Sequence, residues 1–105
     1  SAGFDIYKDD PLGGMEVTEK GFARMTQVLM EIAEATAQGK LVITLEGGYD
    51  VSGQGRSVKT VLKELAQVSP LDKKDLLEKE KNDYSRIGGL ILQLKEIQKQ
   101  YWKTF

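Results

Sequence analysis

The apolar run at residues 41–45, L-V-I-T-L, constrains the fold of this chain more than any other feature. It contains β-branched residues and no alternation of polar and apolar side chains, a pattern typical of a strand buried on both faces of a parallel sheet. One strand cannot form a sheet, and only residues 1–4 resemble the end of another strand. We therefore predict an α/β chain of one or two strands with three to four helices, the C-terminal piece of a larger parallel-sheet domain.

The first helix has clear signals at both ends. Thr18 is a good N-cap residue, and Val17 and Phe22 stand at the two positions of a hydrophobic staple. Apolar residues then recur with the 3.6-residue period of a helix. Gly39 is expected to end this helix in a left-handed conformation.

The second half of the chain is predicted to be helical. A second helix begins near Asp50 or Ser52 and ends at Ser69-Pro70. A mostly charged connector follows at residues 72–81, and a last helix is expected over residues 83–103. We expect one domain in two parts, with the main part at residues 1–69 and a helical tail at residues 70–105.

The composition excludes several classes of site. The 105 residues contain no Cys and no His, so a disulfide framework, a thiolate or imidazole metal site and a His-based acid–base pair are absent from this chain. A net charge of −1 gives no support to nucleic acid as a partner. No apolar run approaches the ~20 residues of a membrane span. With no recognisable signal peptide, we expect a soluble protein in the cytoplasm.

Two segments carry the residues suited to chemistry, S-A-G-F-D-I-Y-K-D-D-P-L-G-G at residues 1–14 and L-E-G-G-Y-D at residues 45–50. Because sites in open α/β sheets form at the carboxyl ends of parallel strands, Asp5 and Tyr49 are expected at one edge of the sheet. On the residues alone, other interpretations stay open. Asp5 also suits a turn cap and Tyr49 a core ring, and Asp9-Asp10-Pro11 is typical of a turn with solvated carboxylates.

These segments, their order, their spacing and the helix start between them resemble the C-terminal part of the zinc-dependent histone deacetylase superfamily. This superfamily includes the bacterial acetoin-utilisation proteins and acetylpolyamine amidohydrolases. Glu46 in L-E-G-G-Y is similar to the class II and bacterial branch. The resemblance extends from residue 1 to about residue 65, and it implies an arginase/deacetylase-like α/β fold.

The resemblance implies roles for five residues. Asp5 stands where the family has a zinc-ligating aspartate, and Tyr49 where it has the tyrosine whose hydroxyl polarises the substrate carbonyl. Leu12 matches a residue that lines the acyl-lysine tunnel, and Gly47 and Gly48 form the loop beside it. In such a site zinc lowers the pKa of its bound water to about 7, and a phenol donor stabilises the developing oxyanion.

The family's other zinc ligands, an Asp-x-His pair, and its tandem His bases have no counterpart here, since the chain contains no His. One carboxylate cannot hold zinc where three protein ligands are needed. We therefore expect an inactive C-terminal fragment that binds no zinc alone, taken from an enzyme that hydrolyses acyl-amide bonds. Its expected partners are the missing N-terminal part of the catalytic domain and further copies of itself, because the strand at residues 41–45 would leave an unpaired edge.

A second hypothesis comes from a different class of function. The last helix, over residues 83–105, carries apolar and aromatic side chains suited to binding in a groove of a partner protein. These are Tyr84, Leu94, Tyr101, Trp102 and Phe105. A stripe of this kind also suits packing against the sheet of the same domain, and both interpretations stay open.

Overall fold

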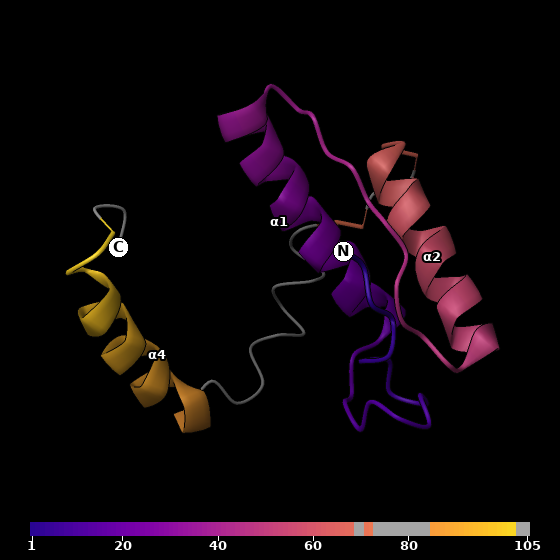
Figure 1. Cartoon of the computed structure of the whole chain (residues 1–105), viewed down its shortest axis with the longest axis horizontal. Helices are drawn as coiled ribbons and strands as arrows, with labels where there is room; N and C mark the ends of the chain where they lie inside the picture. The colour runs from indigo at the N-terminus through magenta and orange to yellow at the C-terminus, as the bar shows by residue number, and fades with distance from the viewer. Residues whose placement is uncertain (69–70, 73–84, 103–105) are drawn as a thin grey trace. The chain divides into compact units, whose positions relative to one another are not determined.

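The computed structural model describes residues 1–68, 71–72 and 85–102. The chain divides into two units, Ser1–Asp72 and Lys73–Phe105. The first unit contains helices α1 (Glu19–Ala37) and α2 (Val51–Leu65), and the second contains α4 (Ser85–Gln98) (Figure 1). Within the described residues, no helix is long and apolar enough to cross a membrane.

Helix α1 confirms the first predicted helix. Thr18 is its N-cap residue, although the Thr18 side chain makes no capping hydrogen bond. Phe22 is buried in the core, and Val17 packs against the same cluster, as expected for a hydrophobic staple. At the other end Gln38 already takes the left-handed conformation, with φ of 54°, and Gly39 follows with φ of 74°. Gly39, the residue after the C-cap Gln38, therefore takes the predicted left-handed conformation at the end of the helix.

Helix α2 begins at the first of the two predicted positions. The Asp50 carboxylate accepts a hydrogen bond from the N–H of Gly53 at 3.2 Å, which satisfies a free donor of the first turn. The helix ends at Leu65, before the predicted stop at Ser69-Pro70, which lies outside the described residues. The predicted connector at residues 72–81 also falls outside them, except for Asp72.

Helices α1 and α2 pack against each other (Figure 1). A buried polar contact joins them, because Gln27 of α1 donates its side-chain amide to the carboxylate of Glu64 in α2 at 3.0 Å. The other oxygen of Glu64 accepts the backbone N–H of Leu71 at 2.9 Å. This carboxylate therefore holds the chain after α2 against both helices.

The predicted parallel sheet is not seen among the described residues. Residues 1–4 and 44–47 run parallel and share three backbone hydrogen bonds of 2.8 to 3.1 Å. They form no more than an isolated bridge between Ala2 and Leu45. Parallel pairing is slightly less stable per residue than antiparallel pairing, and the paired stretch here is short.

The run at residues 41–45 is also not buried on both faces, contrary to the prediction. Val42 is 87% exposed, and Leu45 is exposed as well. A strand of this type is buried only where helices and further strands cover it. Here residues 1–4 are its backbone partner, and Leu41 is half-buried. The homo-oligomer expected from the unpaired edge stays a prediction.

The core of the first unit is small and includes a polar network. Tyr7 is 2% exposed and packs with Phe4, Phe22 and Val61. The Tyr7 hydroxyl donates to Glu19 of α1 at 3.1 Å and accepts from Arg56 of α2 at 2.9 Å. Arg56 also donates through Nε to Glu19 at 2.9 Å. One tyrosine therefore ties the N-terminal segment to both helices.

We expect the change Glu19→Gln to reduce the acid sensitivity of this unit. The hydrogen bond from the Arg56 guanidinium holds the pKa of the Glu19 carboxyl below its usual value, and the Tyr7 hydroxyl adds to this effect. Because the folded pKa is the lower one, the carboxylate stabilises the fold above the unfolded pKa. That contribution is lost as the pH falls through the folded pKa. Urea midpoints at pH 7 and at about pH 3.5 measure it.

The wild-type midpoint should fall more on acidification than that of Glu19→Gln. Arg56→Gln serves as the matched control, because it removes the guanidinium and keeps the carboxyl group. It should flatten the pH dependence in the same way. A full wild-type pH dependence in both variants would show that this ion pair is not its source.

Helix α4 is shorter than the predicted last helix. It covers residues 85–98, and among its apolar side chains Ile87, Leu90, Ile91, Leu94 and Ile97 are exposed. Tyr101 and Trp102 are exposed as well, while Tyr84 and Phe105 lie outside the described residues. The second unit therefore presents an apolar surface of its own.

Candidate functional site

Asp5 lies against the glycine loop that follows residues 41–45. The N–H of Phe4 donates to the carbonyl oxygen of Gly47 at 2.8 Å, which fixes the two backbones side by side. A Cβ atom added to Gly47 would lie 2.6 Å from Oδ2 of Asp5 and 3.0 Å from its Cγ. The structure thus places Asp5 beside Gly47, two residues before Tyr49.

Two further glycines surround Asp5. A Cβ atom at Gly13 would lie 1.5 Å from the backbone oxygen of Asp5, and one at Gly3 would lie 3.0 Å from its Oδ1. Any side chain at position 13 would clash with the backbone of Asp5, so the structure requires glycine there.

Asp10 joins the two loops that carry the remaining predicted residues. Its Oδ1 accepts the backbone N–H groups of Leu12 at 2.9 Å and Gly13 at 3.1 Å. Its Oδ2 accepts those of Tyr49 at 2.7 Å and Asp50 at 3.2 Å. One carboxylate therefore receives four backbone donors from two segments that lie far apart in the sequence.

The sequence interpretation of Asp10 as a solvated turn residue is wrong. Asp10 does open a turn, but only 8% of its surface is exposed. Burial raises the pKa of its carboxyl, and the four backbone donors, first among them Tyr49, outweigh that effect and hold the pKa below its ordinary value. The Asp10 carboxylate is therefore ionised at neutral pH and acts as an acceptor only.

Tyr49 and Leu12 are held by their backbones, while their side chains face solvent. Tyr49 is 56% exposed and Leu12 is 71% exposed. Gly48, directly before Tyr49, has φ of 132°, a conformation that favours glycine. Among the described residues, no hydrogen bond joins the side chains of Asp5 and Tyr49. The structure therefore shows an arrangement of loops that presents a carboxylate and a phenol, rather than a closed site.

A metal ion is not accommodated by these residues alone. Within the part of the chain that the structure describes, no group of three or more Asp, Glu, His or Cys side chains is placed to hold one. Zinc takes three protein ligands in catalytic sites. Both oxygens of Asp10 accept hydrogen bonds from backbone N–H groups, so they are not free for a metal ion.

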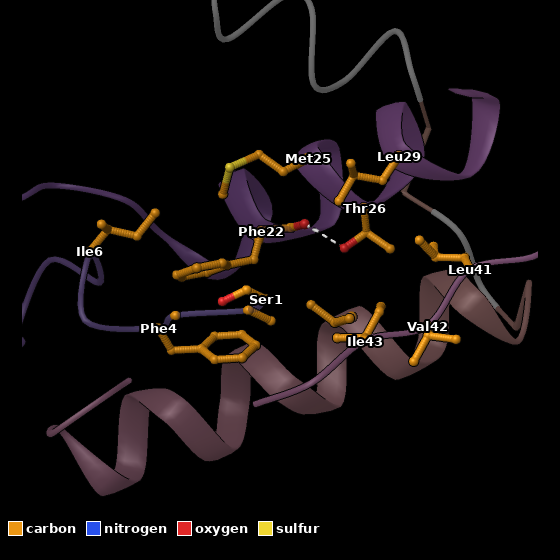
Figure 2. A pocket seen from close by; sticks show the side chains of 13 residues that line it. Ser1, Phe4, Ile6, Phe22, Met25, Thr26, Leu29, Leu41, Val42 and Ile43 are labelled. Carbon is orange, nitrogen blue, oxygen red and sulfur yellow. Dashed lines mark hydrogen bonds between the residues drawn. The ribbon is translucent and has the colours of Figure 1, made fainter. Parts of the chain in front are cut away.

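An apolar pocket of about 390 Å³ lies beside these loops (Figure 2). Its wall includes Phe4, Phe22 and Leu29 and extends to the run at residues 41–43. The Thr26 hydroxyl in this wall donates a hydrogen bond to the carbonyl oxygen of Phe22 at 2.8 Å, which is the dashed line in Figure 2. None of the five predicted site residues lines this pocket.

Asp10 is the residue of this region that sequence reasoning missed. Its contacts with Leu12 and Gly13 could have been predicted from the sequence, because an Asp that accepts the N–H groups two and three residues later is typical of an Asx turn. Its contacts with Tyr49 and Asp50 could not have been predicted, because backbone donors are the same for every residue type except proline.

Residues 1–65 match the histone deacetylase domain family. The chain is 34% identical to histone deacetylase 15 of Arabidopsis thaliana over 99% of its length, which corresponds to 18% of that protein. It is 33% identical to polyamine deacetylase HDAC10 of Danio rerio over 100% of its length and 14% of the relative. It is 31% identical to a probable deacetylase of Archaeoglobus fulgidus over 100% of its length and 32% of the relative.

The chain spans less than a third of the length of each of these relatives. The matched region contains Asp5, Asp10 and the glycine loop with Tyr49, together with both helices that hold them. The family implies the arginase/deacetylase fold. On the match over residues 1–65, the chain belongs to the histone deacetylase domain family.

Proposed function

We propose that this chain forms the C-terminal part of the catalytic domain of a zinc-dependent deacetylase that hydrolyses acyl-amide bonds. The observation that carries the proposal is the placement of Asp5 against Gly47, two residues before Tyr49. This placement lies inside the region that matches the family. A carboxylate and a phenol are thereby presented by neighbouring loops at one end of the first unit.

Each residue has a distinct part in the proposed chemistry. Asp5 would supply one zinc ligand, with the others coming from residues outside this chain. The Tyr49 hydroxyl donates a hydrogen bond to the carbonyl oxygen of the substrate, where negative charge develops in the transition state. Leu12, Gly47 and Gly48 border the path of the acyl group. The solvent-exposed side chains of Leu12 and Tyr49 support this assignment, because a site facing a missing part of the domain is open here.

The branch of the family and the substrate class belong to the same proposal. We assign the chain to the class II-like and bacterial branch on Glu46, the residue before the two glycines. Relatives named for histone and for polyamine deacetylation both match the chain. An acylated primary amine, either a lysine side chain or a polyamine, is therefore the substrate class to test.

A helical interaction module is the second candidate. The exposed apolar side chains of α4, followed by the exposed rings of Tyr101 and Trp102, favour it. An amphipathic helix of this kind binds a hydrophobic groove through residues at helical spacing. Stable capture of one partner protein by residues 85–102, with no effect of Asp5 or Tyr49 changes, would favour this function over the first.

The chain alone is expected to bind no zinc tightly and to hydrolyse no acyl-lysine. The reason is that its described residues assemble no group of three or more possible ligands, while zinc needs three. Metal analysis after dialysis against micromolar zinc, together with a fluorogenic acetyl-lysine assay, tests this expectation. The product of the complete reading frame is the matched control and should show one zinc and turnover. Stoichiometric zinc and turnover in the isolated chain would contradict the proposal, as would an inactive, zinc-free complete protein.

A further inference from the structure

We propose that Asp10 is a positioning residue for Tyr49, and that its carboxylate sets the place of the Tyr49 phenol relative to the Leu12 loop. The inference rests on the proposed function, in which Tyr49 acts on the substrate carbonyl. It adds a residue that makes no contact with substrate in that scheme. Asp10 acts only through the backbone that it holds.

The inference rests on the fact that the two carboxylate oxygens of Asp10 bind different segments of the chain. Oδ1 serves the local turn, through the N–H groups of Leu12 and Gly13. Oδ2 serves the distant loop, through Tyr49 at 2.7 Å and Asp50 at 3.2 Å. A residue needed only for its own turn requires the first oxygen alone. The second oxygen fixes the register between the loop that carries the phenol and the loop that borders the acyl path.

The loop around Tyr49 needs such a constraint. Gly47 and Gly48 precede Tyr49, and glycine permits more backbone conformations than any other residue. The Tyr49 side chain is largely exposed, so packing does not fix its position. Hydrogen bonds to an ionised acceptor are about twice as strong as neutral ones. The contact with Asp10 therefore holds the Tyr49 backbone directly, at its own N–H group.

The same carboxylate also links Tyr49 to the start of α2. Asp50 donates its N–H to Asp10 and, through its own side chain, caps Gly53 of the first turn. The side chain of Gln54 donates to the carbonyl oxygen of Gly48 at 3.2 Å. These hydrogen bonds hold the Tyr49 loop to the N-terminal end of α2, and Asp10 connects that end to the loop at residues 12–13.

The first test is the change Asp10→Asn in the complete protein, with Asp9→Asn as the matched control. The amide keeps the shape of the side chain but presents a donor to one pair of backbone N–H groups. We expect kcat to fall by about 10²-fold, the size of effect that a displacement of about 1 Å produces, with KM changed less than kcat. Zinc content should stay at the wild-type value. Asp9 is exposed and pairs loosely with Lys8 at 3.8 Å, so its variant should keep wild-type kcat.

A double variant separates positioning from general damage. If Asp10 acts through Tyr49, adding Asp10→Asn to Tyr49→Phe should cost little beyond Tyr49→Phe alone. Residual rates are measured with a trifluoroacetyl-lysine substrate, whose carbonyl needs less polarisation. Losses that multiply in the double variant would overturn the inference. Asp10→Glu serves where Asp10→Asn fails to fold, because it keeps the charge and shifts the acceptor atoms.

The outcomes distinguish this inference from the function on which it rests. Wild-type activity in Tyr49→Phe would overturn the proposed function and the inference together. Wild-type activity in Asp10→Asn, beside an impaired Tyr49→Phe, would overturn the inference alone. Hydrogen exchange gives a readout without turnover. Faster exchange of the Tyr49 and Asp50 amides in Asp10→Asn supports the inference, and unchanged exchange overturns it.

Discussion

Under the proposed function, Tyr49→Phe is expected to lower kcat of the complete protein by about 10²–10³-fold, the effect of removing one donor to a developing oxyanion. The change removes a single hydroxyl from a side chain that is largely exposed, so the fold should not be affected. KM and zinc content should stay near their wild-type values. Steady-state kinetics with an acetylated lysine peptide and metal analysis of the same sample measure all three quantities.

Tyr101→Phe is the matched control for this experiment. It makes the same chemical change at another exposed tyrosine, in the second unit of the chain. Its kcat should equal that of the wild type. Equal activity of Tyr49→Phe and the wild-type enzyme would refute the role of the phenol.

Asp5→Ala should produce a different defect in the same protein. If Asp5 is a zinc ligand, its loss should lower the zinc content together with kcat, because the remaining ligands are too few. Asp9→Ala removes a carboxylate from the same segment and should affect neither quantity. A zinc-loaded but slow Asp5→Ala enzyme would show that Asp5 acts on something other than the metal.

The helices of the first unit were predictable because their signals are local. Thr18 precedes α1 and Asp50 precedes α2, and each type of residue favours the N-cap whatever the rest of the chain does. The predicted staple of Val17 and Phe22 likewise spans a few positions. Both helices therefore begin where short-range chemistry indicates.

The sheet was not predictable from the same kind of signal. Residues 41–45 have the composition of a buried strand, yet Val42 is almost fully exposed. Burial of a strand depends on which elements cover it, and the sequence of the strand does not contain that information. Residues 1–4, which resemble the end of another strand, do pair with residues 44–47, but only as an isolated bridge with three hydrogen bonds.

The site divides in a similar way. The rule that strand ends meet at one edge predicts Asp5 near Tyr49, and the structure places Asp5 against Gly47, two residues before Tyr49. The roles of Asp5 and Tyr49 came from the family resemblance, and they stay predictions. The long-range contacts of Asp10 and the network of Tyr7 with Arg56 arise from tertiary packing. No spacing in the sequence indicates them.

Two glycines of α2 offer the sharpest test of the packing. A Cβ atom at Gly53 would lie 2.3 Å from Cε1 of Tyr7 and 2.6 Å from Oδ2 of Asp50. Tyr7 cannot yield easily, since its ring is buried and its hydroxyl is bonded to two side chains. At Gly55, two residues later in the same helix, an added Cβ atom meets nothing within 4 Å. The two positions differ in their surroundings alone.

Gly53→Ala should therefore lower the free energy of unfolding by about 1–3 kcal/mol, the usual effect of overpacking a core. Gly55→Ala should raise it by up to about 1 kcal/mol, because alanine favours the helix and restricts the unfolded chain. Urea denaturation of both variants measures the difference directly. The gain in helix propensity is common to both, so the difference between them measures the close approach of Tyr7 and of the Asp50 carboxylate to Gly53. Equal urea midpoints for the two variants would show that α2 does not pack against Tyr7 through Gly53 in this way.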